Sequence, residues 1–274
     1  MKPLAPLFEI VKEHTRAIDL MLGYLPRQPI RTEEHFDAVI LHRGVNAMKA
    51  AFLLSEEAYW ELGSAGPRQL FELVLNMEEI NRAESRLDAM TKFLWYGYAQ
   101  NVRQRLDDAK WMEGLEGASE VYDIKEMEDF LALPQFDQFK DPAKGNRPPT
   151  WHTSWCNKKV WDLAKESKDP SRIRQYKTLF TYWSGEVHAS PGALRDPLNA
   201  VATPDWMAAS VENDIRRVAE LLIAGLLLLQ QLWVVCVTLP QPTEEQIGDW
   251  NDRMTKFVSE RFGWLPPDLA AAVD

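Results

Sequence analysis

The stretch that decides the fold of this chain is Tyr182-Trp183-Ser184-Gly185-Glu186-Val187-His188-Ala189-Ser190-Pro191. The residues that lead into it recur at helical spacing, and one predicted helix face carries Tyr176, Leu179, Phe180, Trp183 and Val187. Ser184 and His188 lie one turn apart on an adjacent face, at a spacing that allows a hydrogen bond between them. Pro191 predicts the end of the helix, because proline cannot continue it. The stretch therefore predicts a helix that ends in a polar pair.

The chemistry of this polar pair has two interpretations. The ordinary pKa of histidine suits acid–base work at neutral pH, which makes His188 a candidate catalytic residue. A histidine at a helix end also commonly caps carbonyls or packs against neighbours. A serine hydrolase is disfavoured, because the chain has no G-x-S-x-G elbow and no strand to carry Ser184.

A second polar set lies far upstream, on a predicted helix that is otherwise apolar. Arg68, Glu72 and Asn76 are spaced four residues apart and fall on one stripe of this helix. The stripe either faces solvent or is buried. If it is buried, Arg68 and Glu72 must form an ion pair, because an isolated buried charge is very costly.

Helical periodicity extends over nearly the whole chain, and no segment alternates with a period of two. We therefore expect an all-α protein, a bundle of about seven to nine helices in a single domain spanning 1–274. The predicted helices cover about 4–22, 32–63, 84–112, 120–131 and 151–167, with others starting at Pro67, Pro170 and about 205. We expect a polar loop or lid over 134–149. Thr243-x-x-Gln246 matches a capping box and predicts a C-terminal helix within 243–264.

One segment is apolar enough to require a membrane test. Leu221 to Leu239 contains only Gln230, Gln231 and Thr238 as clearly polar side chains, and it is long enough to span a bilayer. An equally apolar helix also suits the middle of a large bundle. No partner span occurs elsewhere, so we predict a buried central helix near the C-terminus and no membrane partner.

Composition and motifs exclude several classes of function. The formal net charge is −10, which opposes a general nucleic-acid surface, although a local basic patch including Arg82, Arg86, Arg103 and Arg105 stays open. Cys156 and Cys236 have no metal-ligand spacing, and no targeting segment is visible, so we expect reduced thiols in a cytoplasmic protein. No H-E-x-x-H, C-x-x-C, P-loop or G-x-G-x-x-G motif occurs, so no metal and no cofactor is predicted.

These two polar sets occur in sequence blocks that resemble a known family. The run Ala51-Phe52 to Glu57, followed by Gly66-Pro67-Arg68-Gln69-Leu70-Phe71-Glu72, is similar to the early block of a large bacterial family, domain of unknown function 5677. The later block of that family resembles Tyr182 or Tyr176, Ser184, His188 and Ser190-Pro191, and Trp151 to Ala164 looks like its tryptophan-led segment. The resemblance covers about 35–238. It implies a helical fold distantly similar to HEPN domains.

The HEPN similarity implies a ribonuclease that serves as a toxin or antiphage effector. The usual HEPN motif is an arginine and a histidine on one helix, with four to six residues between them. The only literal match here runs from Arg147 to His152, and Pro148-Pro149 excludes a continuous helix through it. An equivalent pair would have to combine Arg68 and His188 from different helices.

On this hypothesis each polar residue has a role. His188 is the general base or acid at a ribose 2′-hydroxyl, Arg68 stabilises charge on the phosphate, and Glu72 orients Arg68. Four further residues are candidate binding residues: Asn76, Ser184, Tyr182 and His152. The expected partners are RNA, an antitoxin or defence-system protein, and further copies of this chain.

A second interpretation assigns no catalysis to these residues. Arg68, Glu72 and His188 would then form a buried polar network that fixes helix register. The protein would act as a non-enzymatic interaction or regulatory subunit of a bacterial defence or stress system. A third interpretation, a nucleotide-like ligand bound between helices, has no motif of its own.

Overall fold

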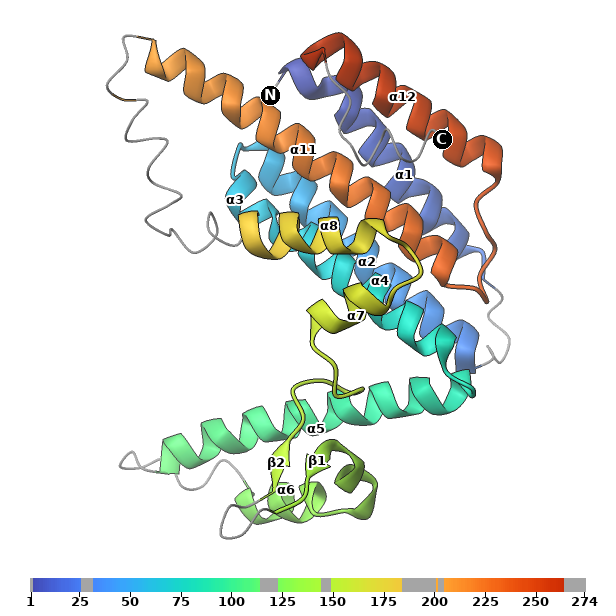
Figure 1. Ribbon diagram of the computed structural model, residues 1–274, viewed down its shortest axis with the longest axis vertical. Helices are drawn as coiled ribbons and strands as arrows, with labels where there is room; N and C mark the ends of the chain where they lie inside the picture. Colours follow the sequence, from blue (N-terminus) through green and yellow to red (C-terminus); the bar gives the residue numbers. More distant parts are fainter. Residues whose placement is uncertain are drawn as a thin grey trace. The chain divides into compact units, whose positions relative to one another are not determined.

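The computed structural model describes residues 2–25, 32–113, 123–143, 149–183, 201 and 205–263. These residues are almost entirely helical, which confirms the predicted all-α class (Figure 1). The chain divides into two compact units, one formed by residues 1–81 and 164–274 and the other by residues 82–163. The boundary between them falls within α7 (Val160–Glu166).

The first unit is a bundle built around one apolar helix, α11. Its elements are η1 (Lys2–Leu4), α1 (Ala5–Gly23), α2 (Thr32–Glu56), α3 (Trp60–Gly63), α4 (Ala65–Arg82), α8 (Ser171–Tyr176), η3 (Lys177–Tyr182), α11 (Trp206–Val235) and α12 (Glu244–Phe262). Helix α11 contacts α1, α2 and α3. It is long and apolar enough to cross a membrane, but 72% of its most apolar window is buried within the protein. The prediction of a buried central helix is confirmed.

Close backbone contact holds α2 against α4 and α11. A Cβ added to Gly66 of α4 would lie 2.6 Å from the carbonyl oxygen of Ala47 and 2.7 Å from the Cβ of Ala51. A Cβ added to Gly225 of α11 would lie 2.7 Å from the sulfur of Met48. Only glycine fits at Gly66, because the nearest atom there belongs to the backbone. The start of α4 is therefore fixed against α2.

The predicted single helix over 32–63 is wrong, since α2 ends at Glu56 and α3 follows as a separate turn. Ala58 has a φ of 65°, a left-handed conformation that ends a helix. The Tyr59 N–H donates to the Leu54 carbonyl at 2.8 Å and closes this end. Trp60 then donates its ring N–H to Asp214 at 3.2 Å, which docks α3 on α11.

The C-terminal helix α12 has the predicted capping box. The Gln246 N–H donates to the Thr243 hydroxyl at 3.1 Å, and the Gln246 side chain accepts from the Thr243 N–H at 3.0 Å. Helix α12 packs on α1, where His14 is buried and its ring stacks on that of Trp250 at 3.9 Å. Burial lowers the pKa of His14 to about 3, so this histidine is neutral at physiological pH.

The second unit packs short elements against one long helix. It contains α5 (Arg86–Glu113), α6 (Ile124–Leu131), η2 (Pro134–Phe139) and a two-residue antiparallel pairing of β1 (Lys140–Asp141) with β2 (Thr150–Trp151). Phe136 and Phe139 are fully buried. Elements η2 and β1 thus occupy part of the segment 134–149 that was expected to be a loop or lid.

The helix predicted over 151–167 is shorter in the structure, where α7 begins only at Val160. Trp151 is extended instead, and its ring packs against that of Phe136 at 6.4 Å. The side chains of Arg103 and Lys140 lie over the same ring, at 4.9 and 5.0 Å. Tertiary contacts of this one tryptophan therefore outweigh the local helical pattern.

Candidate functional site

The structure places some of the predicted site residues and leaves others outside its described part. Arg68, Glu72 and Asn76 lie on α4 in the first unit, and His152 follows β2 in the second unit. Ser184, His188 and the side chain of Tyr182 lie outside the described residues. The geometry of the site therefore starts from α4.

Arg68 is half-buried, and an aromatic ring holds its side chain. Its guanidinium carbon lies 4.6 Å from the ring centroid of Phe180 on η3, a cation–π contact. Phe71 packs against the same ring at 5.9 Å. Within the described part of the chain, the Arg68 guanidinium makes no hydrogen bond or salt bridge. A guanidinium stacked on a ring keeps its edge N–H groups available, so Arg68 is equipped to bind an anion.

Glu72 and Asn76 continue the stripe towards the end of α4. Glu72 is exposed and Asn76 is half-buried, so the stripe is not sealed in the core. The pKa of the Glu72 carboxyl is raised, because desolvation outweighs the opposing effect of the positive charge of Arg68 one turn away. Asn76 donates from its side-chain amide to the Glu72 carbonyl at 2.8 Å. The stripe thus presents a cation and an acid together on one face.

The helical segment that carries Phe180 changes type along its length. Helix α8 passes without a break into η3, whose hydrogen bonds have π-helical spacing, a feature often found at functional sites. Leu179 and Trp183 point into the core. Tyr176 and Phe180 remain half-buried and stack on each other, with ring centroids 5.1 Å apart and planes 4° apart. The sequence pattern did not reveal the π-helical turn.

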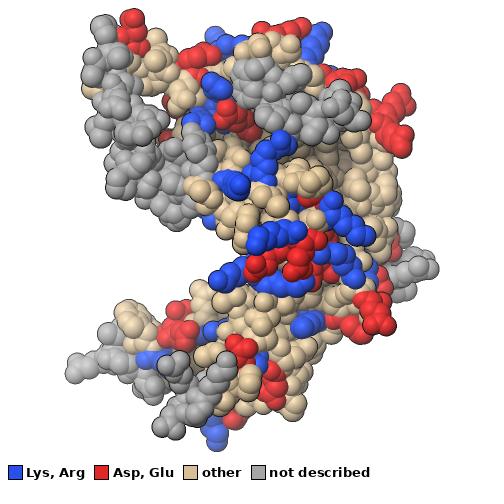
Figure 2. Space-filling view, in the orientation of Figure 1, with Lys and Arg blue, Asp and Glu red and all other residues tan. Residues whose placement is uncertain are grey.

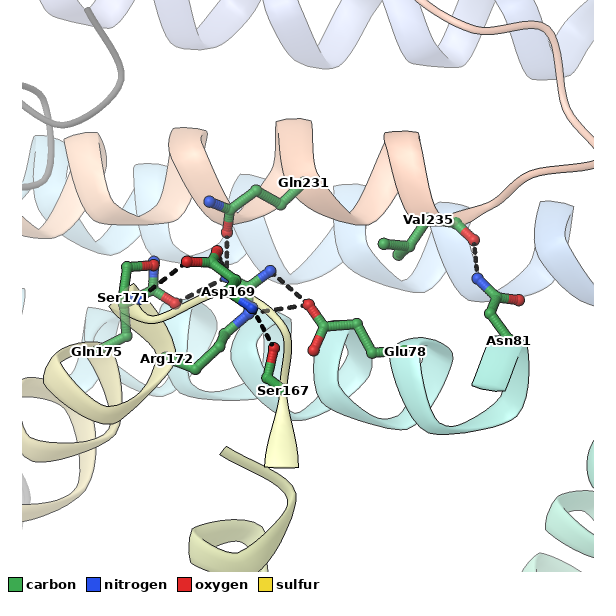
Figure 3. Close-up of polar contacts among 9 residues, drawn as sticks. All are labelled: Glu78, Asn81, Ser167, Asp169, Ser171, Arg172, Gln175, Gln231 and Val235. Carbon is green, nitrogen blue, oxygen red and sulfur yellow. Dashed lines mark hydrogen bonds and ion pairs between the residues drawn. The ribbon is translucent and has the colours of Figure 1, made fainter. Parts of the chain in front are cut away.

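A buried cluster around Arg172 ties α8 to two other helices (Figure 3). Arg172 is 3% exposed and donates to one carboxylate oxygen of Glu78 from Nε at 3.0 Å and from Nη2 at 2.6 Å. Its Nη1 donates to Gln231 of α11 at 2.6 Å and to Gln175 at 2.8 Å. Asp169 lies 3.3 Å from the same Nη1. We call these five residues the Arg172 cluster.

The Arg172 cluster fixes the direction of α8 and η3 along α4. Arg172 meets Glu78 near the end of α4, whereas Phe180 meets Arg68 near its start. The segment from α8 to η3 therefore runs antiparallel to α4. Asp169 also accepts a hydrogen bond from the N–H of Ser171, the first residue of α8, at 2.9 Å.

Sequence reasoning missed this cluster. Glu78 lies in the charged run Glu78-Glu79-Ile80-Asn81-Arg82, which is typical of a solvated helix end. The only available signal was Gln231, a polar side chain in an otherwise apolar helix. A buried amide needs a partner, but nothing in the sequence identifies that partner as Arg172.

His152 belongs to a separate polar set in the second unit. Its Nε2 lies 3.3 Å from a carboxylate oxygen of Asp141, and its backbone N–H donates to the Phe139 carbonyl at 2.8 Å. The hydroxyl of Tyr96 donates to the His152 carbonyl at 2.8 Å, and burial raises the pKa of that tyrosine. Across the described ranges, no group of three or more His, Cys, Asp or Glu side chains is placed to hold a metal ion.

A comparison with models of protein families finds a family that matches this chain. The model of the family of unknown function DUF5677 matches residues 38–201, more than half of the chain. The chain belongs to this family. The matched DUF5677 region includes α4, the second unit and the segment from α8 to η3, so it contains Arg68, Phe180 and Arg172. No curated protein and no solved structure matches the chain.

Proposed function

We propose that this DUF5677 protein is a metal-independent ribonuclease, distantly similar to HEPN domains, that acts as a bacterial toxin or antiphage effector. The observation that carries the proposal is the set of contacts made by the Arg68 side chain. Its guanidinium lies over the ring of Phe180, and within the described residues no salt bridge occupies its N–H groups. Such an arginine can bind a phosphate without first breaking a salt bridge.

The proposed reaction is attack of a ribose 2′-oxygen on the adjacent phosphorus. His188 accepts the proton of the 2′-hydroxyl, the bond from phosphorus to the 5′-oxygen breaks, and that oxygen is then protonated. The products are a 2′,3′-cyclic phosphate and a 5′-hydroxyl. Arg68 stabilises the charge that develops on the phosphoryl oxygens, and Glu72 orients Arg68 by electrostatic attraction. His188 follows Phe180 closely in sequence, which supports pairing it with Arg68.

The test compares cleavage of cellular RNA by the wild type, His188→Ala and Arg68→Ala in the presence of EDTA. We expect His188→Ala to cleave about 10²- to 10⁴-fold more slowly, as is usual for loss of a general base. Arg68→Ala should lose about 10²- to 10³-fold. Arg43→Ala, at an exposed arginine on α2, is the matched control and should retain full activity. Equal cleavage by the wild type and His188→Ala, or none by either, rejects the proposal.

A second candidate function is a non-enzymatic interaction or regulatory subunit of a bacterial defence or stress system. Large apolar side chains exposed on the first unit favour it, among them Leu53, Tyr59 and Leu62 at 62%, 58% and 59%. In that case a protein partner would be captured through these side chains. Arg68→Ala would then change thermal stability without changing any RNA-cleaving activity.

A further inference from the structure

Helix α5 of the second unit has two apolar faces, one buried and one exposed. The buried face packs on α6 and η2 and consists of four residues: Ala89, Tyr96, Ala99 and Leu106. Leu87, Leu94 and Tyr98 recur at spacings of seven and four residues, which places them on the opposite side of the helix. These three side chains are 47%, 44% and 60% exposed, and we call them the outer face of α5.

The outer face of α5 is supported from the core of the second unit. The ring of Trp95 lies 5.9 Å from that of Tyr98 and 5.7 Å from that of the fully buried Phe136. Trp95 and Val102 are both half-buried and widen the apolar surface along one flank. Apolar side chains that recur along one side of a long helix and stay in solvent are typical of an interaction surface.

A glycine lies beside the outer face, in the interior of α5. A Cβ added to Gly97 would have no atom within 4 Å, so packing within the described residues does not require a glycine there. Glycine in a helix interior is destabilising by about 0.5–1 kcal/mol relative to alanine. Its lack of a side chain lets a second helix approach the backbone of α5 closely at this point.

The charges along the outer face are arranged so that the face is complementary to itself. Asp88 lies nine residues before Gly97 and Arg105 lies eight residues after it, and both side chains are exposed. In the described part of the chain, neither of these two side chains is in an ion pair. A second α5 that runs antiparallel, with a two-fold axis at Gly97, brings Asp88 of each copy opposite Arg105 of the other. The same axis brings Leu94 and Tyr98 of the two copies together.

We propose that two copies of this chain associate through the outer face of α5, as an antiparallel helix pair about a two-fold axis at Gly97. This inference does not depend on the proposed ribonuclease function. A different protein would not require an acid and a base at matching distances on either side of one glycine, whereas a two-fold contact between copies does. Acidic and basic side chains are interspersed on the visible face of the protein, so short-range pairs rather than a field of one sign select the partner (Figure 2).

The first experiment measures the mass of the full-length protein by sedimentation equilibrium. We expect the wild type to be a dimer and Tyr98→Glu to be a monomer, because the variant places two like charges at the apolar centre of the pair. Val39→Glu is the matched control, at a valine that is 55% exposed on α2, and should remain a dimer.

Gly97→Leu separates association from folding. Leucine favours a helix more than glycine does, so the helix content measured by circular dichroism should stay the same or rise. The added side chain fills the space into which the second helix packs, so the dissociation constant of the dimer should rise about tenfold or more.

Charge reversal tests the antiparallel arrangement. Arg105→Asp replaces two attractions per dimer by two repulsions, so the dissociation constant should rise about tenfold. Asp88→Arg combined with Arg105→Asp should restore the wild-type dissociation constant, because opposite charges face each other again. For the same reason, an equimolar mixture of the two single variants should form mixed dimers in preference to dimers of either variant.

Three results overturn the proposal. The first is a wild type that remains monomeric at its highest soluble concentration. The second is a dimer whose dissociation constant is unchanged in folded Tyr98→Glu and Gly97→Leu, because another surface then joins the copies. The third is a double charge reversal that associates no better than Arg105→Asp alone. The mixture of single charge variants changes only exposed side chains, so it decides the question even where Tyr98→Glu fails to fold.

Discussion

Two arginines connect α4 with the segment from α8 to η3, and their guanidinium groups have opposite kinds of partner. Arg172 is buried and donates to Glu78, Gln175 and Gln231, with Asp169 beside it. Arg68 is half-buried and rests on the ring of Phe180. A buried guanidinium must have its donors matched, because an unmatched buried charge is costly. The difference supports a structural role for Arg172 and the ligand contact proposed above for Arg68.

The largest effect is expected at Arg172. Arg172→Met leaves the Glu78 carboxylate without the guanidinium that compensates its charge, so the unfolding free energy should fall by about 3–5 kcal/mol. Urea denaturation measures this value. Arg172→Met combined with Glu78→Leu should lose less than Arg172→Met alone, because no buried charge is left behind. If the unfolding free energy of Arg172→Met falls by less than about 1 kcal/mol, Arg172 does not have the structural role assigned to it.

His14 tests a third way to accommodate a buried polar side chain, as a neutral group stacked on Trp250. Its folded-state pKa of about 3 lies below the ordinary 6.5, so the unfolded chain binds the proton more readily. The contribution of neutral His14 to the unfolding free energy is therefore fully present above pH 6.5 and is lost as the pH falls towards 3. Between pH 7 and pH 4 the unfolding free energy should drop by about 3 kcal/mol more in the wild type than in His14→Phe. Parallel pH profiles of the two proteins would contradict the assignment.

A smaller effect is expected at Arg68. Arg68→Met removes one cation–π contact at a partly exposed site, which is worth about 0.5–1 kcal/mol. Thermal or urea unfolding should therefore change little, while RNA cleavage falls as proposed above. A loss as large as that of Arg172→Met would show that Arg68 is part of the structural framework.

The smallest effect is expected at Glu72. Its pKa is raised by desolvation, so the folded state holds the proton more tightly than the unfolded state does. Stability should fall slightly as pH rises through the window above the ordinary pKa of glutamate. Because Glu72 is exposed, the difference from Glu72→Gln should be no more than about a few tenths of a kcal/mol. The opposite slope would mean that the attraction of Arg68 dominates.

Local signals in the sequence correctly predicted the cap of α12 and the burial of α11. Thr243 and Gln246 lie three residues apart and cap α12 as expected, and the apolar run in α11 is buried. The break after α2 was missed, because alanine gives no warning of a left-handed residue at position 58. The stacked pair Tyr176 and Phe180 was predicted to face the core, yet both rings are half-buried beside it.

The candidate site shows the same division between local and distant contacts. The stripe of Arg68, Glu72 and Asn76 is a pattern within one helix, so its common face could be derived from spacing alone. The ring beneath Arg68 could not, because Phe180 comes from a distant segment. The same holds for the Arg172 cluster, because Arg172 is 94 residues from Glu78 and 59 from Gln231. Sequence spacing carries no information on contacts of this range.

The Arg172 cluster also extends beyond the boundary of the family match. Arg172 and Glu78 lie inside the matched range 38–201, whereas Gln231 lies on α11, which begins after it. A fragment cut to the matched range would lose an acceptor for a buried guanidinium and the helix that covers α2. The segment by which the family is recognised is thus smaller than the segment that must fold together. A relative that shares only the matched range has to supply that acceptor and that cover from other residues.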